Sequence, residues 1–174
     1  MKAQFSIALL EQKDTKSFFE LIQNNATRLH QYFPITAREN SSLVATENYI
    51  NRKIREVAAK ENYTFKIVAN DTHLPIGILI IKELNWTQKT CELAYFIDAN
   101  YEGKGYITKG VAQLMNYAKE TLQLEKVIVR IGEDNPGSLR IAEKHGFVLI
   151  KRLKGGHEDF HGNIMDVLHF ERNL

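Results

Sequence analysis

The chain has 174 residues, of which 44% are hydrophobic and 25% are charged, and its formal net charge is +2. This length allows one well-packed core but not two ordinary domains, so we expect residues 1–174 to form a single domain. The interspersed charges form no basic stripe for nucleic acid, and no apolar run approaches the roughly 20 residues that span a bilayer. With one cysteine, Cys91, and no signal-peptide pattern, we expect a cytoplasmic protein without membrane contact.

The first third of the chain predicts one strand and two helices. Apolar residues recur at helical spacing after Asp14, a residue type that caps helices, and again after Ser41 and Ser42. The expected elements are a strand over 4–10, a helix from Asp14 to before Pro34, a loop over 30–40 and a helix over 43–60.

The middle of the chain predicts an antiparallel meander followed by a crossover. Strands are expected over 63–69, 76–84 and 90–97, a helix over 105–122 and a buried strand over 127–131. A strand, a helix and a second strand in this order imply a right-handed connection and a parallel pair.

The last part of the chain has the clearest helix boundaries. Asn135 and Pro136 are typical of a helix start, and Gly146 is typical of a helix end. Strands over 147–153 and 164–170, joined by a glycine-rich loop that holds 157–162, would complete a mixed sheet.

A two-glycine loop lies between the strand over 90–97 and the helix that follows it. Gly103 and Gly105 lack Cβ atoms, so a ligand can approach the backbone closely there. The first helical turn adds unpaired N–H groups and the positive end of the helix dipole. We therefore expect the N–H groups from Glu102 to Ile107 to form a diphosphate cradle.

Three segments together resemble the GNAT acyl-CoA-dependent N-acetyltransferases, and most closely their RimJ/RimL-like branch. They are Asp98-Ala99-Asn100-Tyr101-Glu102-Gly103-Lys104-Gly105-Tyr106, Asn135-Pro136-Gly137-Ser138 and Glu143-Lys144-His145-Gly146-Phe147. The resemblance implies an α/β (α+β) fold with a largely antiparallel sheet of about seven strands and helices on both faces. It also implies acetyl-CoA as co-substrate and a protein N-terminus, especially of a ribosomal protein, as amine acceptor. A homodimer would also fit the resemblance.

The chain departs from the branch at several positions. Asn100 stands where Gln or Arg is common, and Ala94 and Phe96 replace Gly and Trp. Ile35 replaces a common Trp on the expected acceptor side, where Tyr32 and Phe33 are further candidates, so the acceptor cannot be copied from a relative.

Two residues are candidates for the catalytic steps. Glu92 could act as general base, directly or through water, because burial raises the proton affinity of a carboxylate; it could instead be an outward-facing residue or an ion-pair partner. By the resemblance, Ser138 donates a hydrogen bond or proton to the CoA sulfur. The expected cofactor-binding residues are Phe96, Ile97, Asp98, Glu102, Gly103, Lys104, Gly105, Tyr106, Ile107 and Asn135.

Other functions have weaker support. His157-Glu158-Asp159-Phe160-His161 matches the H-E-x-x-H zinc motif, but flanking glycines favour a loop over the required helix, so we expect no metal site. A non-catalytic CoA-binding module would keep the glycine loop without acceptor chemistry. Polyamines, antibiotics and other small amines are alternative acceptors, since a fold alone does not choose among them.

Overall fold

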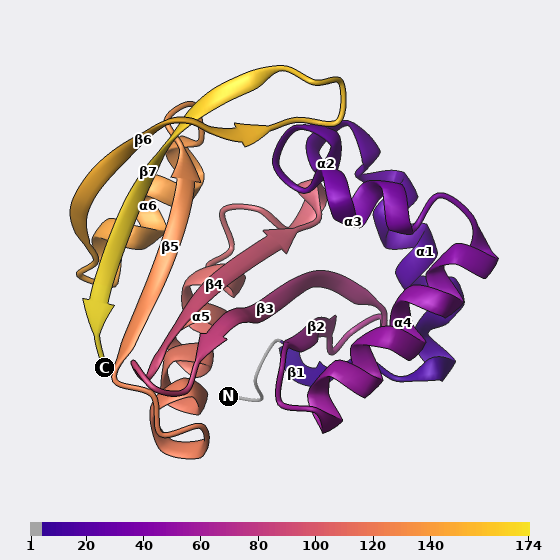
Figure 1. The fold of residues 1–174 in the computed structure, drawn as a ribbon. Helices are drawn as coiled ribbons and strands as arrows, with labels where there is room; N and C mark the ends of the chain where they lie inside the picture. The colour runs from indigo at the N-terminus through magenta and orange to yellow at the C-terminus, as the bar shows by residue number, and fades with distance from the viewer. Residues whose placement is uncertain (1–4) are drawn as a thin grey trace.

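The computed structural model describes residues 5–174, which form a seven-stranded sheet with helices on both faces (Figure 1). The strand order is β1-β2-β3-β4-β5-β7-β6, and every neighbouring pair is antiparallel except β4 and β5. The expected fold is thereby confirmed. The strands are β1 (Phe5–Leu9), β2 (Tyr63–Ala69), β3 (Pro75–Asn85), β4 (Thr90–Ile97), β5 (Lys126–Gly132), β6 (Val148–Glu158) and β7 (Ile164–Asn173).

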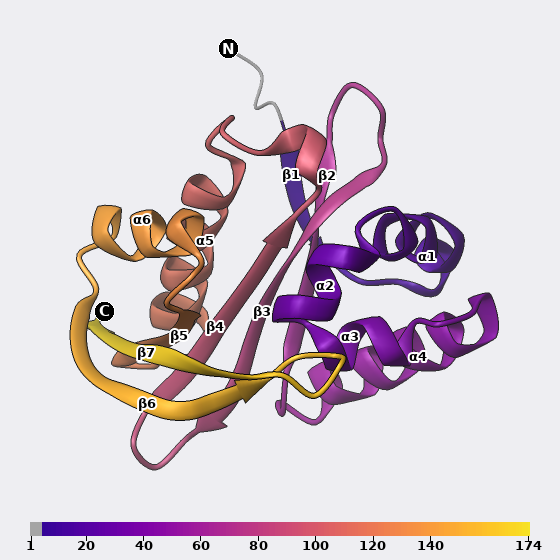
Figure 2. The same cartoon turned by 90° about the horizontal axis from the view of Figure 1, so that it is seen from above.

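The helices divide between the two faces of the sheet (Figure 2). One face carries α1 (Thr15–Asn24), α2 (Ala26–Tyr32), α3 (Pro34–Glu39) and α4 (Leu43–Ala58), and the other carries α5 (Tyr106–Asn116) and α6 (Pro136–Lys144). The 3₁₀ turns η1 (Gln12–Asp14) and η2 (Ala99–Tyr101) precede α1 and α5, and the π-helical segment η3 (Tyr117–Thr121) continues α5.

Two hydrophobic clusters follow from the alternation of side chains along β4. Cys91 and Leu93 belong to the cluster under α5, whereas Ala94 and Phe96 pack with the cluster under α1–α4. Successive strand residues point to opposite faces, so the two helical layers bury opposite sides of the same strand.

The parallel strands β4 and β5 separate soon after they begin. They pair only from Thr90 to Glu92 on β4, which face Lys126 to Ile128 on β5. Beyond Glu92, the edge of β4 that faces β5 has no strand partner within residues 5–174, although β4 remains paired with β3 as far as Ile97. The sheet is therefore forked at its centre.

The N-terminal helices differ from the sequence prediction in two places. The predicted loop over 30–40 is wrong, because α2 continues to Tyr32 and α3 occupies most of the remainder. Pro34 starts α3 at its first turn, where a missing N–H costs nothing. The predicted single helix is also interrupted, since Asn25 separates α1 from α2. Gln4 of the first predicted strand lies outside the described residues.

Helix caps and the final hairpin were predicted with mixed success. Ser42 caps α4 and Asn135 caps α6 through their side-chain oxygens, as expected, but the Asp14 side chain does not cap α1. The strand β6 continues through His157 and Glu158, so the loop predicted over 157–162 is shorter than expected. Within residues 5–174, no helix has the length and apolar character needed to cross a membrane.

Candidate active site

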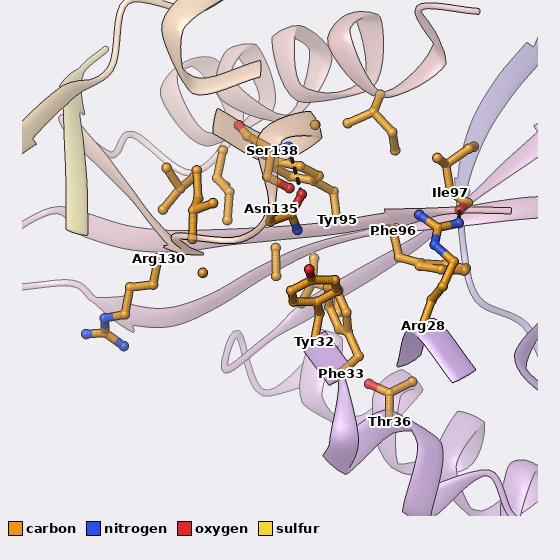
Figure 3. Close-up of a pocket in the computed structure, with 18 of the residues that line it drawn as sticks. Arg28, Tyr32, Phe33, Thr36, Tyr95, Phe96, Ile97, Arg130, Asn135 and Ser138 are labelled. Carbon is orange, nitrogen blue, oxygen red and sulfur yellow. Dashed lines mark hydrogen bonds between the residues drawn. The ribbon is translucent and has the colours of Figure 1, made fainter. Parts of the chain in front are cut away.

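A cavity of about 1110 Å³ opens at the fork between β4 and β5. Its lining includes residues 101–103 and 105 of the glycine loop (residues 98–105), the start of α6, the end of β4 and parts of α2 and α3. Figure 3 shows Ser138, Asn135 and Tyr95 together on one side, with Tyr32, Phe33 and Thr36 on the other. The fold therefore brings the N-terminal and C-terminal halves of the chain to one cavity.

The glycine loop presents free backbone donors to this cavity. Among the described residues, the N–H groups of 103–107 have no hydrogen-bond acceptor, and the N-cap residue Gly105 has no side chain to satisfy them. Glu102 differs, because its N–H donates to the Ala99 carbonyl at 3.4 Å. The available donors thus begin one residue later than the sequence prediction placed them.

Both glycines of the loop adopt left-handed backbone conformations. The φ angles are +71° at Gly103 and +78° at Gly105, a region that costs other residues roughly 1–2 kcal/mol. No heavy atom lies within 4 Å of a Cβ built at either position. A Cβ there would meet no protein atom, so the backbone at both glycines is open to a ligand.

The residues around the glycine loop mainly hold its shape. Asp98 accepts the Asn100 N–H and the Asn25 side-chain amide, both at 2.8 Å, and Lys104 donates to the Asn100 carbonyl at 2.9 Å. Tyr106 packs edge-to-face on Phe5. The side chains of Asp98, Lys104 and Tyr106, predicted to bind cofactor, thus have partners within the protein.

Two residues that support the site were missed by sequence reasoning because their contacts span the chain. Arg28 donates to the Ile97 carbonyl at 3.0 Å, pairs with Glu102 and lies over the Phe96 ring. Asn25 joins the break between α1 and α2 to the glycine loop through Asp98. The one available sequence signal is Asn25 itself, because an asparagine inside a helical pattern tends to form side-chain hydrogen bonds that interrupt the helix.

The start of α6 places a hydroxyl group at the cavity. The Asn135 side chain accepts the Ser138 N–H at 3.0 Å, which fixes the first turn of the helix. The Tyr95 hydroxyl donates to the Ser138 carbonyl at 3.5 Å, and the Ser138 side chain also interacts with the Tyr95 hydroxyl. Burial raises the pKa of Tyr95 to about 12, so its hydroxyl stays protonated near neutral pH.

Glu92 lies at the point where the strands separate. Its side chain is only 7% exposed, with Lys82 Nζ 3.0 Å from one carboxylate oxygen and Arg130 Nη1 2.7 Å from the other. The contact with Arg130 lacks the alignment of a hydrogen bond, which leaves Oε2 a buried acceptor without a hydrogen-bond donor. The structure therefore contains the ion pairs that were the alternative interpretation of Glu92, and one of its oxygens can still accept a hydrogen bond.

The side chains of Phe96 and Cys91 pack on opposite faces of β4, and Phe96 also lines the cavity. The Phe96 side chain points to the α1–α4 face, where its ring meets that of Phe33 at 6.3 Å. Cys91 is fully buried on the opposite face, and burial raises the pKa of its thiol to about 12. A thiol that remains protonated and inaccessible is a poor nucleophile.

The H-E-x-x-H segment lies on a strand and a hairpin turn. His157 is on β6 and its Nε2 lies 2.7 Å from the Gln31 carbonyl, while His161 follows the strand end. Within residues 5–174, no cluster of three or more His, Cys, Asp or Glu side chains could hold a metal ion. The helical spacing that the zinc motif requires is absent from this segment.

Comparison with known proteins shows to which class of protein this fold and cavity belong. The family model described as an acetyltransferase (GNAT) domain matches residues 6–148. The chain belongs to this family and is an N-acetyltransferase that uses acetyl-CoA. The unpaired N–H groups of the glycine loop fit the diphosphate of that co-substrate.

Individual relatives place the chain near the RimJ/RimL-like branch. YdaF of Bacillus subtilis, named provisionally as a ribosomal N-acetyltransferase, is 28% identical over 151 residues, covering 87% of this chain and 81% of YdaF. A spermidine N(1)-acetyltransferase of Vibrio cholerae is 24% identical over 85% of this chain and 81% of its own. A solved RimL structure, a ribosomal L7/L12 alpha-N-protein acetyltransferase in complex with coenzyme A, has a TM-score of 0.90. It is 16% identical and covers 99% of this chain and 96% of that one.

Proposed function

We propose that this acetyltransferase moves the acetyl group of acetyl-CoA directly to the α-amine of a protein N-terminus, with a ribosomal protein as the acceptor. The observation that carries the proposal is one cavity that holds the free amides of the glycine loop, the Ser138 hydroxyl and the Glu92 carboxylate. The ribosomal names of YdaF and RimL support the acceptor class. Residues 1–174 act as a single domain in this proposal.

The backbone of the glycine loop and of β4 would hold the co-substrate. The N–H groups of 103–107 receive the diphosphate, and the unpaired edge of β4 beyond Glu92 pairs with the pantetheine amides as an added strand would. An N–H near Ile97 would polarise the thioester carbonyl. The thioester supplies an activated acetyl group, so the protein contributes mainly positioning and charge stabilisation.

Two side chains would move the protons. Glu92 accepts a proton from the acceptor amine, directly or through water, as the new C–N bond forms. Ser138 donates a hydrogen bond or proton to the sulfur as the C–S bond breaks. Because Cys91 is buried and protonated, the transfer involves no acetylated cysteine.

An acceptor panel tests the proposed function. We expect purified protein with acetyl-CoA to acetylate peptides with free N-termini, and mass mapping to place one acetyl group on the terminal nitrogen. The panel includes spermidine and other small amines, as the Vibrio cholerae relative suggests. Acetylation of small amines with none on peptides would replace the proposed acceptor, and tight acetyl-CoA binding without any transfer would indicate a binding module.

A Glu92→Gln variant tests the proposed base. We expect kcat/KM near neutral pH to fall by about tenfold, because the acceptor amine must then lose its proton to bulk water. The deficit should shrink as pH rises and the free amine becomes abundant, so the measurement is a pH profile of both proteins. A deficit of the same size at all pH values would reduce Glu92 to its ion-pair role.

A further inference from the structure

Three charged side chains from neighbouring strands meet at the fork of the sheet. Lys82 on β3, Glu92 on β4 and Arg130 on β5 form this group, here called the fork cluster. Lys82 and Glu92 are directly paired residues of the antiparallel strands β3 and β4. The cluster holds two cations against one carboxylate, so it carries a net positive charge beside the cavity that all three residues line.

The fork cluster lies on the acceptor side of the cavity. Glu92 alternates with Cys91 and Leu93, whose side chains are buried under α5, so it shares its face of the sheet with Ala94 and Phe96. That face is the one that α1–α4 cover. Figure 3 shows Arg130 at the opposite end of the pocket from Arg28.

The two cations keep donors that Glu92 does not use. The side chain of Glu92 is 7% exposed, whereas those of Lys82 and Arg130 are 37% and 41% exposed. Glu92 is the sole ion-pair partner of each cation among the described residues. Arg130 therefore has guanidinium N–H groups available for a second anion, and a guanidinium binds carboxylates through paired hydrogen bonds.

The acidic residues that line the cavity are mostly engaged elsewhere. Glu39 pairs with Arg52, and Glu102 pairs with Arg28. Asp159 accepts hydrogen bonds from its own turn, including the His161 N–H at 2.8 Å. Glu158, on the exposed β6 end, is the acidic lining residue without a partner among the described residues. The cavity therefore has few unpaired carboxylates that could bind a second ammonium group of an acceptor.

We infer that the acceptor carries an anionic group close behind its reacting amine, held by Lys82 and Arg130 while the amine faces Glu92. This inference rests on the proposed function and narrows it to N-termini with an acidic residue near the start. Charge complementarity supports this inference. The amine of the acceptor would lie beside the Glu92 carboxylate, and its anionic group would lie beside the cations Lys82 and Arg130. Polyamines are disfavoured as acceptors, because they would place a second cation beside Lys82 and Arg130.

A charge series of acceptors tests the inference. Peptides that differ only in Asp, Asn or Lys at the second position are compared by kcat/KM. We expect the Asp peptide to exceed the Lys peptide by about fivefold or more, the effect of a partly exposed charge pair. In Arg130→Gln and Lys82→Gln the ratio should fall toward one, whatever happens to the absolute rates. An equal rate for all peptides with the wild-type protein would overturn the inference and leave N-terminal acetylation intact.

A control variant tests whether the charge preference comes from the fork cluster. A second series of acceptors tests whether the preference depends on peptides. Arg152 pairs with Glu133 and Asp166 on the outer strand β6 and does not line the cavity, so Arg152→Gln should keep the wild-type ratio. A series of small primary amines with a carboxylate, no charge or a second amine repeats the comparison without peptides. Preference for the carboxylate amine there supports the inference even if peptides are not acceptors. Preference for the diamine, or a wild-type ratio in both fork-cluster variants, contradicts it.

Discussion

Replacing Ser138 by alanine is expected to lower kcat by about 100-fold, the lower range of effects for a positioned proton donor. Within the described residues the Ser138 hydroxyl interacts with the Tyr95 hydroxyl, which also donates to the Ser138 carbonyl and keeps that bond in the variant. The Ser138 N–H would keep its bond to Asn135, and α6 would stay capped. The dissociation constant for acetyl-CoA should therefore change little, which single-turnover kinetics and calorimetry measure separately.

Two further variants distinguish a chemical role from a structural one. Ser17 occupies the third position of α1 as Ser138 does in α6, and it lies outside the cavity, so Ser17→Ala should retain full kcat. Asn135→Ala removes the cap and should lower the free energy of unfolding by about 1 kcal/mol. Unchanged turnover in Ser138→Ala would remove the role we assign to this serine.

Substitution of Gly105 by alanine is expected to weaken acetyl-CoA binding by on the order of 100-fold, because several charge-assisted hydrogen bonds depend on close approach to the backbone. The new methyl group would stand where no protein atom lies within 4 Å, on the residue between the free N–H groups of 104 and 106. The positive φ of +78° adds a stability cost of roughly 1–2 kcal/mol. Calorimetric titration with acetyl-CoA and thermal unfolding report the two effects.

Gly146 provides the matched control for this variant. It has a φ of +68° and no heavy atom within 4 Å of a built Cβ, but it ends α6 away from the cavity. Gly146→Ala should therefore lose similar stability and bind acetyl-CoA normally. If Gly105→Ala binds as tightly as the wild-type protein does, the N–H groups of the glycine loop do not hold the diphosphate.

The parts of the site that obey local rules could be predicted from the sequence. The Asn135 cap, the glycine positions and the β4 boundaries depend on residues within a few positions of one another. Pro34 was misinterpreted because proline ends helices as well as beginning them, and no apolar periodicity marked the short helix α3. The two glycines before His157 likewise suggested a loop, whereas an irregular register keeps β6 paired with β7 past them.

The contacts that complete the site depend on strand order and register. Lys82, Glu92 and Arg130 come together because β3, β4 and β5 are neighbours in this order, which residue types alone do not specify. Arg28 reaches the carbonyl of Ile97 from a helix distant in sequence. The sequence indicated Glu92 as a candidate general base, but its charged neighbours could be identified only from the fold.

The fork in the sheet also bears on how the molecule gains rigidity. A sheet whose central strands stay joined by only three residue pairs has its weakest cross-link in the middle, between a half built on β1–β4 and a half built on β5–β7. A co-substrate whose amide groups form hydrogen bonds along the open edge of β4 would act as an added strand and connect the two halves. Binding of acetyl-CoA would then stabilise the folded protein, and the complex would be more rigid than the free enzyme.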